Sequence, residues 1–293
     1  MTERVVINAE LKNDPRMVRL SELLRELGRV AIAFSGGVDS TFLAAVAGET
    51  LGRANVLLVT AISETYGPRE RADSETLAEL LGLERIVIDT HELEIPEFRH
   101  NPPDRCYYCK KELFTQIREV VAGRGKFVMC DGSNTADTHD FRPGRRAVRE
   151  QGVRSPLLEA GLSKDDIREL SRRMNLPTWN KPAYACLSSR FPYGTDISPE
   201  MVERVGACEE ELFKLGFTGC RVRHHGDVAR IEVPPERIAE IAAPEMRRRV
   251  VERFKALGYK YVTLDLQGYR TGSMNEVLSD EIRLAEGEKP SRS

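Results

Sequence analysis

The stretch VAIAFSGGVDSTFLAAVAGE, residues 30–49, joins an apolar run to a helical pattern through a glycine-rich turn. Residues 30–34 suit a buried strand, and the small and apolar residues from position 41 onward favour a helix. The turn at residues 35–40 therefore brings backbone N–H groups and a helix start to one place, where a phosphate can bind. Gly36 and Gly37 allow positive φ and close approach of a ligand.

The flanking sequence repeats this strand-then-helix order. Further apolar runs occur at residues 55–61, 85–90 and 126–132, and helical patterns at residues 68–81, 109–125 and 163–175. Ser163 and Asp166 have the spacing of a capping box at the start of the last pattern, and Pro177 follows its end. We predict an α/β fold in which a Rossmann-like parallel sheet carries helices on both faces.

The pattern changes after residue 195. Residues 199–217 and 234–258 are predicted to be helical, residues 220–225 and 228–233 to form a hairpin, and residues 260–266 to form a strand. A chain of 293 residues is also long enough for two cores. We therefore predict domains at residues 1–195 and 196–293, the second a small α+β domain for substrate binding and oligomerisation.

Composition limits the partners and the compartment. The chain has 44 Lys and Arg against 46 Asp and Glu, a net charge of −2, so we expect no nucleic-acid partner. We find no secretory signal and no apolar run of about 20 residues, which predicts a cytoplasmic protein with no membrane contact. In that compartment the six cysteines stay reduced and suit metal, cluster or catalytic roles.

An aspartate lies inside the anion-binding turn. The turn is neither a Walker loop nor a dinucleotide fingerprint, and it contains no lysine to neutralise phosphate. Asp39 would repel a triphosphate unless a divalent cation lay between them, and Mg²⁺ prefers carboxylate and phosphate oxygens. We predict that Asp39 binds Mg²⁺ and that ATP is held by Ser35, Gly36, Gly37, Val38, Asp39 and Ser40. The alternative is an ordinary glycine turn.

The motif SGGVDS resembles the pyrophosphate loop of the ATP pyrophosphatase (PP-loop) superfamily, whose fold is adenine nucleotide alpha hydrolase-like. That resemblance implies cleavage of ATP between the α and β phosphates and transfer of AMP to an oxygen of the substrate. It does not identify the substrate. Asp131 and Asn134, with Ser133 and Asp137, follow the fourth predicted strand, where they would orient ATP or Mg²⁺. Turn and N-cap chemistry is the alternative.

Three cysteines are candidates for one site. Cys106 and Cys109 form a CxxC pair, which fits a redox pair, half a zinc site or part of a cluster. Cys186 lies in a loop expected at the carboxyl edge of the sheet. Three thiolates leave a zinc site incomplete, whereas in a [4Fe-4S] cluster they leave one iron open for an extra sulfide. Core packing is the expected role of Cys130, Cys208 and Cys220.

Two arginines alternate along a predicted strand. Arg221, Arg223 and His225 share one face, and two guanidinium groups there suit a phosphate. The alternative is a solvated strand face. His224 and His225 point to opposite faces, which argues against a metal site.

Longer motifs carry a second resemblance. The segments NPPDRCYYCKKELF, DGSNTADTHDFRPGRRA, SPLLEAGLSKDDIRELSRRMNLPTWNKPAYACLSSRFPYGT, RVRHHGDVARIEV and GYRTGSMNE together resemble the LarE family of ATP-dependent sulfur transferases in nickel-pincer nucleotide biosynthesis, which serves lactate racemase maturation. The resemblance implies that the carboxylates of pyridinium-3,5-biscarboxylic acid mononucleotide are adenylated and become thiocarboxylates. It assigns Arg221, Arg223 and Arg270 to the substrate phosphate, and we place Arg190 in the same substrate site.

The source of sulfur divides that family. Some members sacrifice a cysteine, whose counterpart here is Cys186, and others hold a [4Fe-4S] cluster by three cysteines. Cys106, Cys109 and Cys186 place the sequence with the second group, supplied by sulfide or another sulfur donor, and family members form hexamers. A tRNA thiolase with the same loop and a three-cysteine cluster, and a nucleotide-sensing module without chemistry, are the alternatives. The first requires a basic RNA-binding surface, and the second leaves the cysteines unexplained.

Overall fold

The computed structural model describes residues 5–138, 141–182, 185–270 and 272–279. Its contacts divide these residues into two compact units. The first contains residues 5–92 and 104–182, and the second contains residues 93–103 and 185–279. Each unit is described separately below.

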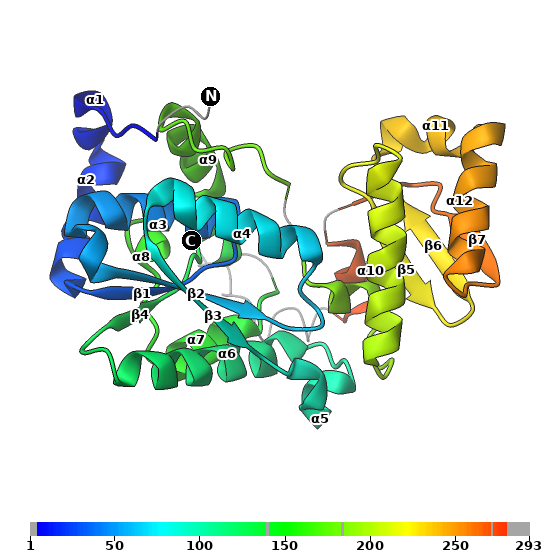
Figure 1. The fold of residues 1–293 in the computed structure, drawn as a ribbon, viewed down its shortest axis with the longest axis horizontal. Coiled ribbons are helices and arrows are strands. Elements are labelled where there is room, and N and C mark those ends of the chain that lie inside the picture. Colours follow the sequence, from blue (N-terminus) through cyan, green and yellow to red (C-terminus); the bar gives the residue numbers. More distant parts are fainter. Residues whose placement is uncertain (1–4, 139–140, 183–184, 271, 280–293) are drawn as a thin grey trace. The chain divides into compact units, whose positions relative to one another are not determined.

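A parallel sheet of four strands lies at the centre of the first unit (Figure 1). The strands have the order β3-β2-β1-β4 and are β1 (Val30–Ala33), β2 (Val56–Ile62), β3 (Glu84–Asp89) and β4 (Val128–Cys130). Val30 of β1 pairs in parallel with Val56 on one side and Val128 on the other. The strands coincide with the four predicted apolar runs, so the predicted α/β class and parallel sheet are confirmed.

Helices cover both faces of this sheet (Figure 1). They are α1 (Ala9–Lys12), α2 (Pro15–Leu27), α3 (Val38–Leu51), α4 (Pro68–Leu81), α6 (Arg105–Ala122), α7 (Gly144–Glu150), α8 (Pro156–Glu159) and α9 (Lys164–Arg173). Val30 and Ile32 face the core that includes α2, α3 and α9, whereas Ala31 faces the core that includes α6. Because both faces of β1 and most of β2 are buried, these strands read as continuous apolar runs.

The start of α9 matches its predicted cap. Ser163 Oγ accepts a hydrogen bond from the Asp166 backbone N–H, and the Ser163 backbone N–H donates to Asp166 Oδ2 at 2.9 Å. Arg16 of α2 pairs with Asp166 at 2.7 Å and so fixes α9 beside α2. The cap determines where the next residue, Lys164, begins the helix.

The second unit is built on a three-stranded sheet of order β5-β6-β7 (Figure 1). Its strands are β5 (Arg221–His225), β6 (Val228–Glu232) and β7 (Tyr261–Leu264). Its helices are α5 (Pro96–Arg99), α10 (Pro199–Lys214), α11 (Ile238–Ala242) and α12 (Pro244–Ala256). The predicted hairpin is present, since β5 and β6 pair antiparallel, and β7 adds to β6 in parallel.

The helix predicted at residues 234–258 is wrong as a single element. Residues 235–237 form a 3-10 turn, and α11 and α12 are separated at Ala243. Ala243 has φ −56° and ψ 142°, the extended conformation that a following proline imposes, and Pro244 begins the next helix.

The second unit also takes in a segment from early in the chain. Residues 93–103 belong to it because Asn101 Nδ2 donates to the backbone oxygens of Phe191 and Pro192, at 3.1 and 2.8 Å. Ile197 N in turn donates to Arg99 O at 2.9 Å. The division between the units falls between residues 182 and 185, whereas the sequence predicts a boundary near residue 195.

Candidate active site

The glycine-rich turn has the backbone of an anion site. Gly36 has φ +67°, and Gly37 is the N-cap of α3. A Cβ atom on Gly36 would lie 3.1 Å from Ser74 Cα on α4, so conformation and space both require glycine there. Ser35 Oγ and Ser40 Oγ lie 3.2 Å apart and close the turn. The Val38 side chain is in the core, so only its backbone N–H can serve an anion.

Two lysines from distant segments reach this turn. Lys164 Nζ lies 2.5 Å from Asp39 Oδ2, and Lys181 Nζ donates to Gly36 O at 3.0 Å. The turn itself contains no lysine, as its sequence shows, but the fold brings two lysines to it. The turn alone could not reveal these residues, because they lie 125 and 145 positions away from their partners. One sequence feature could have drawn attention to Lys164 as a site residue: it directly follows Ser163, the predicted helix cap.

Asp39 is held by two side chains. Besides the ammonium of Lys164, Asn134 Nδ2 donates to Asp39 Oδ1 at 3.3 Å. Asn134 Oδ1 accepts a hydrogen bond from Ala136 N at 3.0 Å, so the turn after β4 fixes which edge of the amide faces Asp39. The structure therefore brings Asp39 and Asn134 together, as the carboxyl-edge placement predicted.

Asp131 has a different setting. It is 1 % exposed and accepts hydrogen bonds from Ser133 Oγ at 2.6 Å and Ser155 Oγ at 2.7 Å. Lys110 Nζ lies 3.6 Å from Asp131 Oδ2. These contacts join β4 to the segments that contain Ser155 and Lys110. In this arrangement Asp131 supports the turn that carries Asn134.

Two of the candidate cysteines lie at the start of α6. Cys106 is exposed and Cys109 is half-buried. The Cys109 thiol donates to Glu92 Oε1 at 3.7 Å, and Thr90 Oγ1 donates to the same oxygen at 3.2 Å. Glu92 is 6 % exposed, and its Oε2 has no hydrogen-bond partner in the part of the chain that the structure describes. A buried carboxylate oxygen without a partner beside a thiol is a fitting neighbour for a bound group that supplies a positive charge or a donor.

Cys186 lies in the second unit, immediately before a 3-10 turn (Leu187–Arg190). It is half-buried. Within residues 5–138, 141–182, 185–270 and 272–279, no three or more His, Cys, Asp or Glu side chains form a group that could hold a metal ion. A cluster held by Cys106, Cys109 and Cys186 thus remains a prediction. Its three thiols come from two units.

The other cysteines are core residues, as predicted. Cys130, Cys208 and Cys220 are fully buried. Burial raises the pKa of the Cys208 and Cys220 thiols to about 12 and also raises the pKa of Cys130. Neutral thiols of this kind are poor nucleophiles and poor metal ligands.

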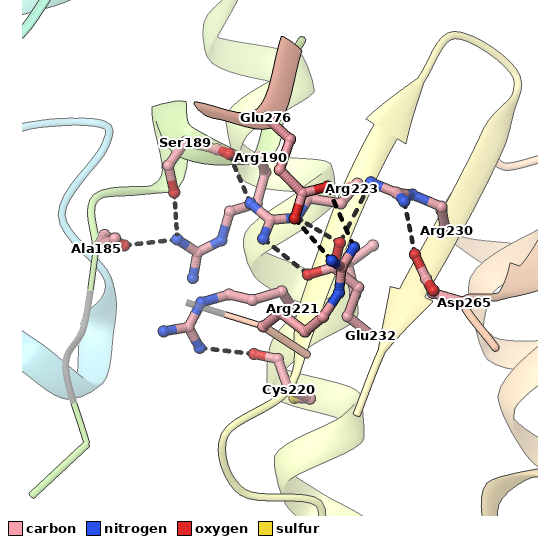
Figure 2. A network of polar contacts seen from close by, with 12 residues as sticks. Ala185, Ser189, Arg190, Cys220, Arg221, Arg223, Arg230, Glu232, Asp265 and Glu276 are labelled. Atoms are coloured by element: carbon pink, nitrogen blue, oxygen red, sulfur yellow. Dashed lines mark hydrogen bonds and ion pairs between the residues drawn. The ribbon is translucent and has the colours of Figure 1, made fainter. Parts of the chain in front are cut away.

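A buried arginine, Arg190, reaches the loop that contains Ala185 and Ser189 (Figure 2). Arg190 is 2 % exposed and forms two 2.8 Å hydrogen bonds with the Glu209 carboxylate. Its Nη1 also donates to Ala185 O at 2.6 Å and Cys186 O at 3.1 Å. The arginine predicted for the substrate site therefore also fixes the cysteine loop.

Arg221 and Arg223 point to the same region (Figure 2). They are 3 % and 8 % exposed, so the alternative of a solvated strand face is wrong. Arg223 forms a bidentate pair with Glu232, at 3.0 and 2.7 Å, and donates to Ser189 O at 2.8 Å. Arg221 donates to Cys220 O at 2.7 Å and stacks over the Tyr269 ring.

The electrostatics of this region favour an anion. Burial and the nearby charge of Arg190 lower the pKa of Arg221. An anionic ligand beside both guanidinium groups would relieve that repulsion. Arg270 pairs with Glu276 at 2.7 Å, and His224 turns away to bond Tyr259 Oη at 2.9 Å.

Comparisons with known proteins show which family this chain resembles. The NAD synthase family model matches residues 20–102. The chain is 41% identical over 266 residues to an uncharacterised protein of Synechocystis sp., covering 91% of this chain and 99% of that protein. It is 41% identical over 256 residues to the pyridinium-3,5-bisthiocarboxylic acid mononucleotide synthase of Lactiplantibacillus plantarum, covering 87% and 92%.

A more distant match concerns tRNA modification. The tRNA-specific 2-thiouridylase MnmA of Persephonella marina is 24% identical over 189 residues, covering 52% of this chain and 54% of that protein. Separately, none of the helices among the described residues combines the length and the apolar character needed to cross a membrane.

Proposed function

The chain belongs to the LarE family of ATP-dependent sulfur transferases, and on that premise we propose how its residues insert sulfur into the carboxylates of a pyridinium mononucleotide. It is an enzyme that uses ATP. The observation that carries the proposal is the identity of 41% to a synthase of that product over 87% of the chain.

Activation of the substrate takes place at the glycine turn. The backbone N–H groups of residues 35–40 bind the triphosphate, and Asp39 would hold the Mg²⁺ that accompanies ATP. Lys164 Nζ, 2.5 Å from Asp39, is then within reach of the phosphates and neutralises their charge. A substrate carboxylate oxygen attacks the α phosphorus, the bond to the β phosphate breaks, and pyrophosphate leaves.

Sulfur transfer completes the reaction. A sulfur nucleophile attacks the acyl carbon of the adenylate, and AMP leaves with the oxygen that had attacked phosphorus. Water must be excluded, because it would hydrolyse the mixed anhydride. The buried guanidinium groups of Arg221 and Arg223 bind the substrate phosphate, with Arg190 beside them and Arg270 as a further donor.

Cys106, Cys109 and Cys186 are the residues that would hold a [4Fe-4S] cluster. The three thiols fit as donors, since these are the cysteines that are not buried in the core. When bound, such a cluster supplies sulfide from an iron that no protein group ligates. The protein's role is to provide the thiolates and to protect the site from water.

The proposal is tested by incubating the protein with ATP, Mg²⁺, sulfide and pyridinium-3,5-biscarboxylic acid mononucleotide. Thiocarboxylate, AMP and pyrophosphate should form in equal amounts. ATP binding without pyrophosphate release would instead support the nucleotide-sensing alternative. Salt-sensitive binding of tRNA in a gel-shift assay would support the tRNA thiolase.

The source of sulfur needs a separate measurement. Iron and acid-labile sulfide in anaerobically purified protein would support the cluster. A sacrificial Cys186 predicts no iron and a chain that loses about 34 Da on turnover, the mass of hydrogen sulfide. We further propose a cytoplasmic homo-oligomer, a hexamer by family resemblance, which light scattering tests.

A further inference from the structure

Tyr66 lies between β2 and α4 in the chain, and its hydroxyl contacts the backbone of the nucleotide turn (residues 35–40). Tyr66 Oη donates to Ser35 O at 3.1 Å and lies 3.2 Å from Glu70 O in the first turn of α4. Tyr66 N donates to Ser63 O at 3.1 Å. Gly67 N donates to Glu70 Oε2 at 3.0 Å. The hydroxyl therefore reaches the turn from a segment whose own backbone is fixed by hydrogen bonds.

The contact with Ser35 O determines the direction of the next N–H group. The peptide bonds of the described residues are trans. In a trans peptide the C=O and N–H groups point in opposite directions. Because Tyr66 holds Ser35 O on one side of the Ser35–Gly36 peptide, the Gly36 N–H points to the other side.

The Gly36 N–H is a donor that the protein itself leaves unused. Gly36 is a buried residue, and its N–H has no acceptor in the part of the chain that the structure describes. Nearly all buried N–H groups in proteins have a partner, so an unused one indicates a ligand. Among the described residues the Val38 N–H has no acceptor either, since Val38 is the first residue of α3. Two unused donors in one glycine turn suit an anion.

The Tyr66 hydroxyl is suited to hold a carbonyl oxygen at neutral pH. Burial raises the pKa of Tyr66 to about 12, so the oxygen keeps its proton and can donate it. A phenol that donates in this way is neutral. It fixes the peptide without adding a charge beside the phosphates.

We propose that Tyr66 is a positioning residue, which holds the Ser35–Gly36 peptide so that the Gly36 N–H is presented to the phosphates of ATP. The inference rests on the proposed function, because it takes the turn as the ATP site. A donor that already points into the site does not have to be ordered when the ligand binds. Tyr66 therefore increases the affinity of the turn for phosphate through the peptide.

The Ser35–Gly36 peptide can be observed by itself, because Ser35 is the only serine in the chain that is followed by glycine. Cell-free synthesis with carbon-13 in the serine carbonyl groups and nitrogen-15 in the glycines gives one carbonyl-selected NMR signal, from this peptide. In the wild-type protein, Mg²⁺ with pyrophosphate should move the Gly36 amide proton to higher frequency, as a new hydrogen bond to an anion does. Without ligand, Tyr66→Phe should move the Ser35 carbonyl carbon to lower frequency, because that oxygen loses its donor.

Binding measurements test the consequence for the nucleotide. Tyr66→Phe keeps the ring and removes only the hydroxyl. Calorimetry should show about fivefold weaker binding of Mg²⁺-pyrophosphate, and of an ATP analogue with a methylene group between the α and β phosphorus atoms, the effect of one hydrogen bond. The ligand-induced shift of the Gly36 amide proton should shrink as well. The matched control is Tyr261→Phe, at a tyrosine that is 63% exposed, which should bind as wild type does.

Thermal melting verifies that both variants are folded, and the remaining outcomes separate the two ways to fail. If the wild-type protein binds neither ligand, the ATP site is wrong and the inference falls with the proposed function. If the wild-type protein binds them and Tyr66→Phe has the same affinity, the inference alone is overturned. Weaker binding by Tyr66→Phe with an unmoved Ser35 carbonyl signal would also overturn it, since the loss would then not come from this peptide.

Discussion

At the scale of single residues, the ion pair between Lys164 and Asp39 places a positive charge next to the carboxylate predicted to bind Mg²⁺. Replacing Lys164 by Met should reduce the rate of pyrophosphate release about 100-fold, because one fixed electrostatic contact to the reacting phosphates is lost. Pyrophosphate is measured with the full substrate set. Lys12→Met is the matched control, and equal rates in the two variants would remove Lys164 from the mechanism.

At Gly36 both the positive φ and the lack of space for a side chain require glycine. At Gly28 only the positive φ does. Gly36→Ala places a methyl group 3.1 Å from Ser74 Cα at φ +67°, whereas Gly28→Ala at φ +73° meets no atom within 4 Å. Both variants should lose stability to backbone strain, because φ is positive at both positions. Only Gly36→Ala should also lose ATP binding, measured by calorimetry. Normal ATP affinity in Gly36→Ala would show that the turn does not contact the nucleotide.

Arg221 offers a cleaner test of the phosphate site than Arg223. Removing Arg223 leaves Glu232 buried beside fewer cations, and breaking a buried pair costs about 3–5 kcal/mol of stability. Arg221→Met should weaken binding of the mononucleotide about 10-fold or more, since one charge-assisted contact is lost. The dephosphorylated nucleoside should bind wild type and Arg221→Met equally. Equal loss for both ligands would assign Arg221 a structural role.

At the scale of elements, the junction of α2 and α9 depends on acidic side chains. Hydrogen bonds from Arg16 lower the pKa of Asp14, and those from Ser163 and Arg16 lower the pKa of Asp166. A carboxylate whose pKa is lowered in the folded state stabilises that state above its ordinary pKa of about 3.9. The stabilisation is lost as the pH falls through the lower, folded-state pKa.

Asp14→Asn should isolate this charge, because asparagine caps a helix as well as aspartate does. We expect the variant to be about 2 kcal/mol less stable at pH 7, with a difference that shrinks as the pH falls below about 3.9. Urea unfolding at several pH values measures both quantities. A difference that stays constant down to pH 2 would show that the loss is not one of charge.

Elements were predictable from sequence wherever the pattern was local. The central strands β1 and β2 were predicted because burial on both faces makes them continuous apolar runs, as at residues 55–61. The edge strand β3 is more exposed but has the same kind of β-branched run. The single helix predicted at residues 234–258 failed because its apolar pattern outweighed the break that Pro244 imposes. The position of residues 93–103 was missed because it depends on contacts such as that of Asn101 with Phe191, far away in sequence.

At the scale of the whole molecule, the residues predicted for the site are distributed between the two units. The nucleotide turn, Lys164, Cys106 and Cys109 belong to the first, and Cys186 with Arg190, Arg221 and Arg223 belongs to the second. The sequence identified the turn because SGGVDS is a contiguous motif. It could not identify Lys164 or Lys181, since an ordinary lysine becomes part of a site only through the fold.

The central claim is that a substrate carboxylate is activated as an acyl-adenylate. An oxygen-18 label in that carboxylate tests the claim, because the attacking oxygen should end in AMP. The substrate is prepared with oxygen-18 in its carboxylates and converted with ATP, Mg²⁺ and sulfide. Mass spectrometry of the AMP should find one oxygen-18 atom per thiocarboxylate formed, because the attacking oxygen leaves with AMP. Unlabelled AMP, or label in inorganic phosphate formed together with ADP, would contradict the account.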